Sequence, residues 1–468
     1  MSERFSADIL VVGAGPAGLC AAAEAAQYGW KVTVLDEYMR PGGRLLGQLH
    51  QERGGNWWNG IQEAKRLADS ATRAGVEVRT GVSVTGLEQA SGVAEGWDVW
   101  TDSGRFRGRQ LLLATGAAES AIPVPGWTLP GVMSIGAAQV MTNVQRVRVG
   151  NRGVVIGMSV LAMAILSELR LAGIEIAAVV LPPRHPLSGD ASIPSQVFAS
   201  LLRFAHLAPR PLFRMGARLV QPSVLRKLAL AGYPKRGLKL MGTPLQLRRT
   251  ALEIIGDGGV EGVRVADVQP NGSAIPGSER VVEADFVCIA GGLYPLVELA
   301  AVAGCPFRYI PQLGGHVPEH DERMRTPLPR LFVAGNITGV ESAKVAIAQG
   351  RVAGLSMAMS MNEAYGSASV EGRRDSRGAE LLDGENALRG TASLESTNVL
   401  RGAASFESEN AFRGAAPLNE KYAARDGAPL EEKLQTALEA VKQARREALI
   451  QFQPGIVEVR QEMYAKSR

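Results

Sequence analysis

The sequence predicts an α/β fold made of two Rossmann-like domains, the second inserted in the first, with a repeat-containing tail and a helix at the carboxyl end. Three observations lead to this prediction. Residues 8–36 follow the pattern of strand, glycine turn, helix and strand. A second pattern of strand, helix and strand begins at Gly153 and ends near Val180. A further strand and helix occupy residues 330–357, as expected when an inserted unit interrupts the first one.

The first pattern is sharply defined. Residues 8–12 are a short apolar run typical of a buried strand, and the alanine-rich stretch 19–28 favours a helix that ends at Gly29. Residues 31–35 alternate as a second strand. Three later runs of β-forming residues, at 76–84, 97–101 and 109–113, predict an antiparallel meander within the parallel sheet.

The composition changes after residue 365, where Arg-Gly pairs recur with a period of 12 at 377/378, 389/390, 401/402 and 413/414. The repeat is weakly apolar, so we expect a flexible or loosely helical linker, with packing on a partner as the alternative. Residues 430–452 then show an amphipathic helical pattern. The expected divisions are a first Rossmann-like domain at 1–120 and 290–360, an inserted second one at 121–289, a linker at 361–429 and a helix at 430–468.

Composition excludes several classes of protein. The 468 residues carry a net charge of +5, which is mild for this length. Three cysteines at unrelated spacings exclude a disulfide framework and a thiol redox pair. The longest apolar stretch, 154–166, is too short for a membrane span, and no signal peptide is recognisable, so we expect a cytoplasmic protein.

One stretch has an uneven charge. Residues 191–252 contain eleven basic residues and no acidic one. We expect the solvated face of packed helices, with contact to a partner or to a membrane surface as the alternative. Few aromatic residues are interleaved with the basic ones, which argues against nucleic-acid binding.

The turn Gly13-x-Gly15-x-x-Gly18 follows a strand and opens a helix, and an acidic pair, Asp36 and Glu37, follows at the end of the next strand. This is the dinucleotide-binding fingerprint in its full context. Gly13 allows the tight turn, Gly15 lets the backbone approach a pyrophosphate, and Gly18 lets the helix pack on the strand. The amino end of the helix offers N–H groups and a positive dipole end to phosphates.

Further motifs indicate which dinucleotide binds. The glycine turn, Pro41-Gly42-Gly43, Ala114-Thr115-Gly116-Ala117 and the run from Leu331 to Asn336 together resemble the FAD-binding set of flavoproteins related to thioredoxin reductase. The segment from Pro125 to Val132 resembles more closely the alpha-type subunits of heteromeric opine oxidases, hydroxyproline dehydrogenases, sarcosine oxidase and hydrogen cyanide synthase. The resemblance extends over roughly residues 5–360.

This resemblance implies FAD as the cofactor. Asp36 or Glu37 would hold the adenosine ribose, and Val82 would lie by the adenine. Asn336 stands where the family usually has Asp, and the lost charge implies weaker binding. Lys344 would lie near the flavin pyrimidine ring, with a solvated lysine as the alternative. The residues implied for FAD binding are Gly13, Gly15, Pro16, Ala17, Gly18, Asp36, Glu37, Gly43, Arg44, Val82, Ala114, Thr115, Gly116, Gly335, Asn336 and Lys344.

The second glycine turn departs from the fingerprint. Ser159 stands at the position of the second glycine, and the strand that ends at Pro182 offers no acid for a ribose, so we predict that NAD(P)H is not used. No catalytic residue or metal ligand can be assigned. His50 is expected either to face the flavin or to be structural. Loop or surface positions are expected for the remaining histidines, His185, His206, His316 and His320.

The function implied by the resemblance is electron transfer by an FAD subunit within a heteromeric amine, imino-acid or opine dehydrogenase or oxidase, acting on CH–NH bonds. The implied partners are a second, amine-oxidase-like flavoprotein and, because no cysteine follows Cys305, a separate small [2Fe–2S] polypeptide. The basic stretch 191–252 and the helix from Leu430 are the expected contact surfaces. Two alternatives remain: a stand-alone NAD(P)H-dependent FAD oxidoreductase, and a non-catalytic scaffold subunit with a degenerate flavin site.

Overall fold

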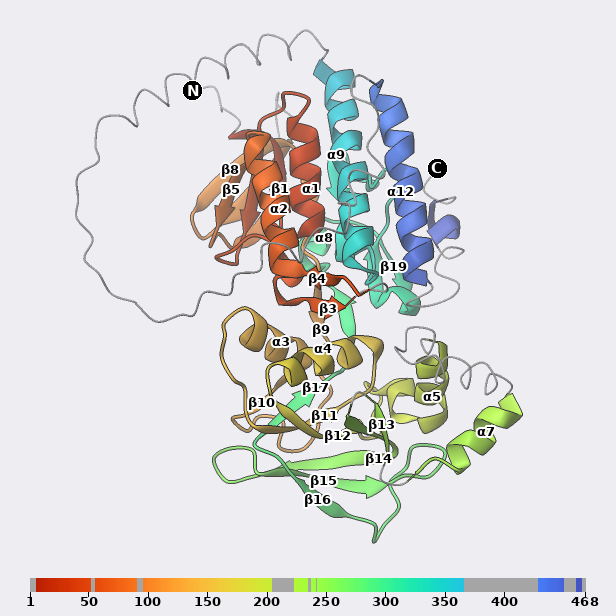
Figure 1. Cartoon of the computed structure of the whole chain (residues 1–468). Helices are drawn as coiled ribbons and strands as arrows, with labels where there is room; N and C mark the ends of the chain where they lie inside the picture. Colours follow the sequence, from red (N-terminus) through yellow and green to blue (C-terminus); the bar gives the residue numbers. More distant parts are fainter. Residues whose placement is uncertain are drawn as a thin grey trace, which may run out of the picture.

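The computed structural model describes residues 6–51, 55–90, 96–203, 223–234, 237–240, 242–365, 428–449 and 460–464. These residues form two lobes, each built around one large sheet (Figure 1). The predicted α/β fold, with a second Rossmann-like unit inserted in the first, is confirmed. The 12-residue repeats lie outside the described residues.

The first lobe contains a seven-stranded sheet in the order β5-β2-β1-β8-β7-β6, with β21 beside β8. Its strands β1, β2, β5, β8 and β21 pair in parallel, and β6, β7 and β8 form an antiparallel meander. The bounds are β1 Ala7–Val12, β2 Val32–Asp36, β5 Glu77–Thr80, β6 Val84–Ala90, β7 Gly96–Thr101, β8 Gly104–Leu113 and β21 Leu331–Val333.

The antiparallel meander was expected to include residues 76–84, but it begins only at β6. Residues 77–80 form β5, which pairs in parallel with β2 rather than with the meander. Helix α2 (Gly60–Arg73) precedes β5 and carries the chain back over the sheet, and a crossover of this kind returns a strand in the parallel direction. The Asn59 side chain caps α2 by accepting hydrogen bonds from the N–H groups of Ile61 and Gln62.

The second lobe contains an eight-stranded sheet in the order β10-β17-β11-β12-β14-β15-β16, with β13 beside β14. The parallel strands are almost wholly buried, as in sheets covered on both faces. The bounds are β10 Val132–Ser134, β11 Arg152–Ile156, β12 Glu175–Leu181, β13 Leu238–Leu240, β14 Thr243–Ile255, β15 Gly262–Asp267, β16 Arg280–Glu283 and β17 Phe286–Ile289; its helices are α3 Ile135–Asn143, α4 Val160–Leu171, α5 Pro194–Arg203, α7 Ser223–Ala231 and the short turn η2 Gly189–Ser192.

The two connections between the lobes are paired. The chain leaves the first lobe through β9 (Ala117–Glu119) and returns through β18 (Leu293–Pro295), and these two strands form an antiparallel ladder. Two small ladders, β3 with β4 and β19 with β20, complete the first lobe. The remaining bounds are β3 Leu49–Gln51, β4 Trp57–Asn59, β19 Phe307–Ile310, β20 Gly315–Pro318, α8 Glu298–Val302, η1 Gly43–Gly47, η4 Pro311–Leu313 and η5 Gly335–Thr338.

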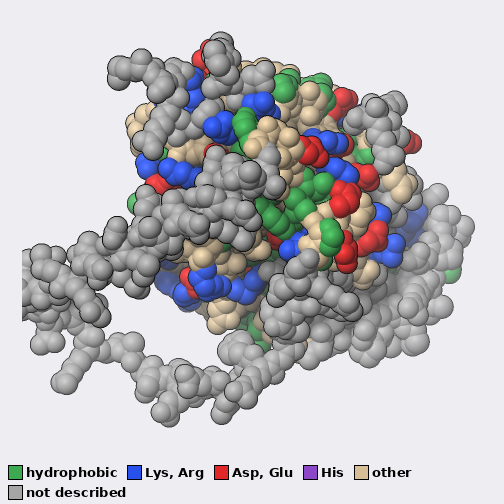
Figure 2. All heavy atoms as spheres, turned by 90° about the horizontal axis from the view of Figure 1, so that it is seen from above, with side chains coloured by type: hydrophobic (Ala, Val, Ile, Leu, Met, Phe, Trp, Pro, Cys, Tyr) green, Lys and Arg blue, Asp and Glu red, His purple; other side chains and the backbone are tan. Residues whose placement is uncertain are grey.

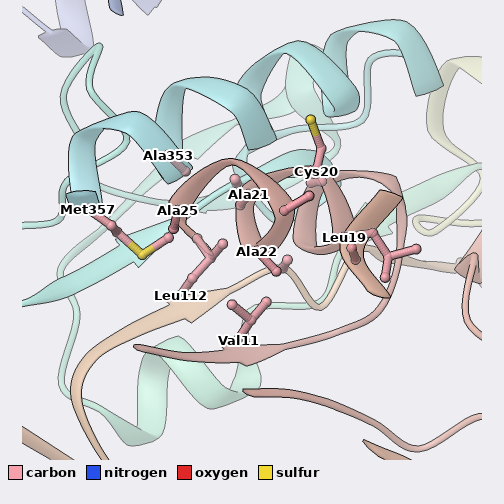
Figure 3. Close-up of a cluster of buried hydrophobic side chains, with 14 of the residues drawn as sticks. Val11, Leu19, Cys20, Ala21, Ala22, Ala25, Leu112, Ala353 and Met357 are labelled. Atoms are coloured by element: carbon pink, nitrogen blue, oxygen red, sulfur yellow. The ribbon is translucent and has the colours of Figure 1, made fainter. Parts of the chain in front are cut away.

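Three long helices lie side by side over the first sheet: α1 (Pro16–Ala26), α9 (Ala343–Tyr365) and α12 (Leu430–Leu449) (Figure 1). Figure 3 shows α1 between the sheet and α9, with Val11 and Leu112 on one side and Ala353 and Met357 on the other. Alanines dominate α1, so its backbone can approach both neighbours closely.

The carboxy-terminal helix is present, and its apolar face is occupied. Leu434, Ala437 and Val441 of α12 are buried in the same core as α1 and α9. Helix α9 covers this apolar face, and the opposite, polar face of α12 is exposed, so the prediction that the helix contacts a partner is not tested. On the face of the molecule seen from above, basic and acidic side chains are intermixed (Figure 2).

The contact between α1 and α9 depends on two glycines of α9. A Cβ at Gly350 would overlap the carbonyl oxygen of Ala17, and a Cβ at Gly354 would overlap that of Ala21. Alanine normally stabilises a helix relative to glycine, by about 0.5–1 kcal/mol. Because backbone atoms of α1 cannot move aside, steric overlap outweighs this gain at Gly350.

We therefore expect Gly350→Ala to lower the free energy of unfolding by about 1–3 kcal/mol, measured by chemical denaturation. Gly232→Ala is the control, because Gly232 is exposed and a Cβ there makes only ordinary contacts; we expect a change within about 0.5 kcal/mol. A Gly350→Ala protein as stable as the parent would show that the helices are not in close contact.

Candidate functional site

The glycine turn between β1 and α1 is shaped by its glycines in two different ways. Gly13 has a φ of +105°, and a Cβ there would overlap the carbonyl oxygen of Ala114. A Cβ at Gly18 would overlap the carbonyl oxygen of Gly13. A Cβ at Gly15, in contrast, would meet no atom within 4 Å. Gly13 and Gly18 are thus required by the fold, whereas Gly15 faces open space that a ligand can occupy.

The amino end of α1 keeps its backbone donors free of side-chain caps. Gly15 is the N-cap residue and makes no side-chain capping bond, and the first intrahelical hydrogen bond runs from Leu19 N–H to the Gly15 carbonyl. Pro16 has no N–H, so the N–H groups of Ala17 and Gly18 point out of the helix end. Together with the positive end of the helix dipole, they form an arrangement suited to a phosphate.

The two acidic residues at the end of β2 have different surroundings. The Asp36 carboxylate accepts hydrogen bonds from the N–H groups of Ala14 and Tyr38, so it braces the glycine turn. Burial raises the pKa of Asp36, and these two hydrogen bonds oppose the rise. Glu37 is exposed at the strand end. Val82 is buried nearby, and its N–H donates to the Asp36 carbonyl oxygen at 3.0 Å.

The Pro-Gly-Gly motif packs directly on the glycine turn. The Gly42 N–H donates to the Ala14 carbonyl at 2.7 Å, and a Cβ at Gly43 would lie 3.2 Å from the Cα of Gly15. From the same segment, Arg44 Nε donates to the Ala117 carbonyl at 2.9 Å. The first two predicted motifs therefore form one continuous surface.

The motif after β8 lies across the turn. The Ala114 N–H donates to the Val12 carbonyl at 2.8 Å, and the Thr115 hydroxyl donates to the Leu296 carbonyl at 2.6 Å. A Cβ at Gly116 would meet no atom within 4 Å. Gly116, like Gly15, therefore faces open space.

The motif that ends at Asn336 also lies beside the glycine turn, although it comes much later in the chain. A Cβ at Gly335 would lie 2.8 Å from the Cβ of Ala17, which puts η5 against the first turn of α1. The buried Gln349 side chain accepts the Gly335 N–H at 2.9 Å and donates to the Thr338 hydroxyl at 3.0 Å. Asn336 is half-buried in this turn.

Lys344, the second residue of α9, is half-buried, with its Nζ 5.9 Å from the centre of the Trp58 ring. Trp58 donates from Nε1 to Gln48 at 3.1 Å and stacks on the exposed His50 at 6.1 Å between ring centres. Residues from η5, α9 and the β3–β4 ladder thus meet beside the amino end of α9. Lys344 lies within cation–π distance of an aromatic ring, and this position is compatible both with a place near a flavin and with a solvated lysine.

The helix after the second glycine turn has a side-chain cap at its amino end, which the helix after the first turn lacks. Ser159 is the N-cap residue of α4, and its hydroxyl accepts the Ala162 N–H at 3.1 Å. This bond satisfies one of the donors that a phosphate would need. A Cβ at Gly157 would overlap the Ala290 carbonyl, so the remaining glycine serves the fold.

Sequence reasoning missed Glu168, a buried acid at the junction of the lobes. Its carboxylate accepts hydrogen bonds from Leu49 N–H at 3.1 Å, Gln139 Nε2 at 2.8 Å and Asn143 Nδ2 at 2.6 Å. Burial raises the pKa of Glu168 to about 7, and these hydrogen bonds oppose the rise. No motif marks Glu168, because the partners come from separate elements.

Of the loop or surface positions expected for His320, the structure shows the loop position. This histidine lies in a loop but is fully buried, and burial together with Arg460 lowers its pKa to about 3. In the part of the chain that the structure describes, no group of three or more His, Cys, Asp or Glu side chains is placed to hold a metal ion. Within the same residues, no helix is both long and apolar enough to cross a membrane.

Comparison with known proteins confirms the resemblance. Residues 7–192 match the family described as pyridine nucleotide-disulphide oxidoreductase. An opine oxidase subunit of Agrobacterium tumefaciens is 31% identical over 362 residues, which are 75% of this chain and 65% of that protein. The hydrogen cyanide synthase subunit HcnB of Pseudomonas aeruginosa is 28% identical over 78% of this chain and 73% of that protein.

A solved structure supports the fold independently. Thioredoxin reductase of T. acidophilum superposes with a TM-score of 0.53 at 22% identity, covering 76% of this chain and 99% of that one. The chain is thus a homologue of oxidoreductase subunits and has the two-domain thioredoxin reductase fold. It spans slightly less than two thirds of the length of its opine oxidase relative.

The raised pKa of Glu168 predicts how the free energy of unfolding depends on pH. Because the folded-state pKa of Glu168 lies above its ordinary value of 4.5, the folded protein binds more protons than the unfolded chain between about pH 4.5 and about pH 7. The stability contribution of Glu168 therefore falls as the pH rises through this window.

We expect the unfolding free energy of the parent protein to fall relative to that of Glu168→Gln between pH 5 and pH 8, measured by urea denaturation. Glu283→Gln is the control, because Glu283 is exposed; its difference from the parent should not change with pH. A constant difference between Glu168→Gln and the parent would contradict the raised pKa.

Proposed function

We propose, on the premise that this chain is a homologue of the opine oxidase and hydrogen cyanide synthase subunits, that it binds FAD at the first glycine turn and acts as the electron-transfer subunit of a heteromeric amine, imino-acid or opine dehydrogenase or oxidase. The observation that carries the FAD assignment is the contrast between the two helix ends. At α1 the backbone donors are uncapped and face open space at Gly15. At α4 Ser159 caps the equivalent position.

The residues around the first turn fit a dinucleotide. Open space at Gly15 and Gly116 leaves room for phosphates and for the adenosine half, because a side chain at either position would occupy it. Asp36 is engaged with the turn, so the exposed Glu37 is the better acceptor for ribose hydroxyls. Asn336 in η5 would reach the ribitol and pyrophosphate with a carbonyl acceptor.

When bound, FAD supplies the capacity to take up and pass on electrons. The protein supplies position and charge. The first turn of α1 holds negative phosphates with its N–H groups, and Val82 offers an apolar contact to the adenine. Lys344 places a positive charge at the start of α9, where it would stabilise negative charge on a bound ring.

The subunit role is supported by the names of the relatives. Both the opine oxidase and the hydrogen cyanide synthase relatives are named as subunits. We propose that a second flavoprotein oxidises the C–N bond and that a separate [2Fe–2S] polypeptide passes electrons on. We also propose the domain divisions given above, with FAD on residues 1–120 and 290–360 and a degenerate nucleotide domain at 121–289. We propose the basic stretch 191–252 or the exposed polar face of α12 as the surface that contacts the partner.

Two alternatives are separable by simple measurements. A stand-alone NAD(P)H-dependent FAD oxidoreductase would lose its flavin absorbance within seconds of anaerobic mixing with NADH or NADPH, which the Ser159 cap disfavours. A scaffold subunit with a degenerate flavin site would show no absorbance near 450 nm after purification.

The FAD site predicts the effect of one substitution. The backbone angles of Gly15 are ones that any residue can adopt, and a Cβ at this position would meet no protein atom within 4 Å. Gly15→Val should therefore fold normally, with a thermal midpoint within a few degrees of the apoprotein, but should retain less than a tenth of the parent's flavin by absorbance.

Gly232→Val tests whether any new valine has this effect, since Gly232 is exposed and its Cβ would make only ordinary contacts. It should keep the parent's flavin content. If Gly15→Val keeps a full complement of FAD, the cofactor is held elsewhere.

The subunit role predicts where activity appears. We have assigned no acid–base pair or thiol pair to the residues proposed for the site, so we expect substrate oxidation to need a pocket on a second polypeptide. The purified chain with FAD should not reduce a dye with proline, hydroxyproline, sarcosine or an opine as substrate. Co-expression with the proposed amine-oxidase-like partner should give dye reduction and a co-purifying complex. Robust turnover by the chain alone would overturn this role.

A further inference from the structure

Two arginines from the carboxyl end of the chain converge on one buried glutamate. Glu341 lies just before α9 and has a side chain that is 4% exposed. Arg445 of α12 donates from Nε to Glu341 Oε1 at 3.1 Å. Arg460, beyond α12, donates from Nη2 to Glu341 Oε2 at 2.7 Å. Residues more than a hundred positions apart thus meet at the start of α9.

Arg460 also holds the turn before α9. Its Nη2 donates to the carbonyl oxygen of Thr338, the last residue of η5, at 2.7 Å. A Cβ at Gly339 would lie 2.9 Å from the same nitrogen, so the turn has just enough room for the guanidinium. One side chain therefore links η5 to the start of α9.

Two aromatic side chains complete the cluster. Neutral His320 donates from Nδ1 to the Pro318 carbonyl at 2.8 Å, and its Nε2 faces Arg460 Nη1 at 3.5 Å. Tyr464 lies edge-on to the His320 ring, with 5.8 Å between ring centres, and its hydroxyl accepts Arg445 Nη1 at 3.2 Å. We call Arg445, Arg460, Glu341, His320 and Tyr464 the C-terminal clamp.

The C-terminal clamp carries an excess positive charge. Among the residues that the structure describes, two buried guanidinium groups face one buried carboxylate and the histidine is neutral, so these side chains together carry a net charge of about +1. Within the described part of the chain, Arg445 Nη2 and Arg460 Nε are buried and have no hydrogen-bond partner. Burying an unbalanced charge costs stability, and apolar residues would pack the same space at a lower cost. Such costs are typical of positions kept for function.

The excess charge lies next to η5 and the start of α9, and this position indicates what the C-terminal clamp does. η5 contains Gly335 and Asn336, and α9 begins with Lys344 as its second residue. Gly335 is tied to Thr338 through the Gln349 side chain. A displacement of Thr338 is therefore transmitted to Gly335, which touches the first turn of α1.

We propose that the C-terminal clamp positions η5 and the start of α9 for cofactor binding, and that its excess positive charge favours the negatively charged reduced form of the flavin. This proposal rests on the proposed function, because it presumes that FAD binds at the α1 turn. Arg460 is a positioning residue, since it acts through Thr338 and Glu341 rather than by contact with the cofactor.

The test compares two arginine-to-methionine variants of the full-length protein. Arg460→Met removes the bonds to Thr338 and Glu341 and makes the cluster neutral, while Arg445 still pairs with Glu341. Arg446→Met removes the same charge from an exposed position next to the clamp. FAD is titrated into each apoprotein by fluorescence quenching, and the midpoint potential is measured by dye equilibration.

We expect Arg460→Met to bind FAD at least tenfold more weakly and to have a more negative potential, and Arg446→Met to stay within twofold of the parent. Arg460→Lys keeps the charge without the forked geometry, so it should restore the potential more fully than the affinity. A merely structural role would not produce this separation.

Two results would overturn the proposal: an Arg460→Met protein with the parent's affinity and potential, or a shift of equal size in Arg446→Met. If Arg460→Met fails to fold, Glu341→Gln decides, because it raises the net charge and should make the potential more positive; an unchanged potential would refute the charge effect. A parent protein that binds no FAD would instead refute the proposed function.

Discussion

The first turn of α1 is the constraint on which the rest of the structure depends. The Pro-Gly-Gly segment, the turn after β8, η5 and α9 all approach it so closely that a single added Cβ on several of them would meet backbone or side-chain atoms of the turn. Because these contacts use backbone rather than long side chains, they leave little freedom to shift. Open space remains beside Gly15 and Gly116, so the packing that stabilises the domain also shapes the candidate site.

Both lobes contain a strand, a glycine turn, a helix and a second strand, but the helix that follows the glycine turn begins differently in each. The Ser159 hydroxyl satisfies a helix donor that remains free in the first lobe. Of the two helix ends, only that of α1 is therefore left without a side-chain cap. The lobe is then available for another role, and its contacts with the first lobe through Glu168 and Asn143 fix it against η1 and β3. Buried hydrogen bonds of this kind favour one arrangement of the two lobes.

The carboxyl end is part of the domain rather than an appendage. Helix α12 adds a third layer over α9, and the segment beyond it inserts a charged side chain beneath the turn that precedes α9. The paired arginines and the glutamate stabilise one another, yet the excess charge is unfavourable for folding alone.

The sequence by itself determined the features that local rules govern. Strand, turn and helix periods identified both Rossmann-like units, and the glycine spacing located the first turn, because these signals lie within about thirty residues. The boundary of the meander was misjudged at residues 77–80, since strand direction depends on where α2 returns the chain. The site residues of the FAD set stay predictions, although the structure gathers Gly15, Gly43 and Gly335 at one place.

Only the tertiary structure decided which polar residues are buried together. Glu168 and His320 carry no sequence signal, because their pKa values depend on burial and on partners far away in the chain. The apolar face of residues 430–449 predicted a contact without saying with what, and only the packing showed that α9 covers it. Arg460 and Glu341 are 119 positions apart, and no periodicity relates them. Local patterns fix the elements, whereas charge pairing and burial are properties of how those elements meet.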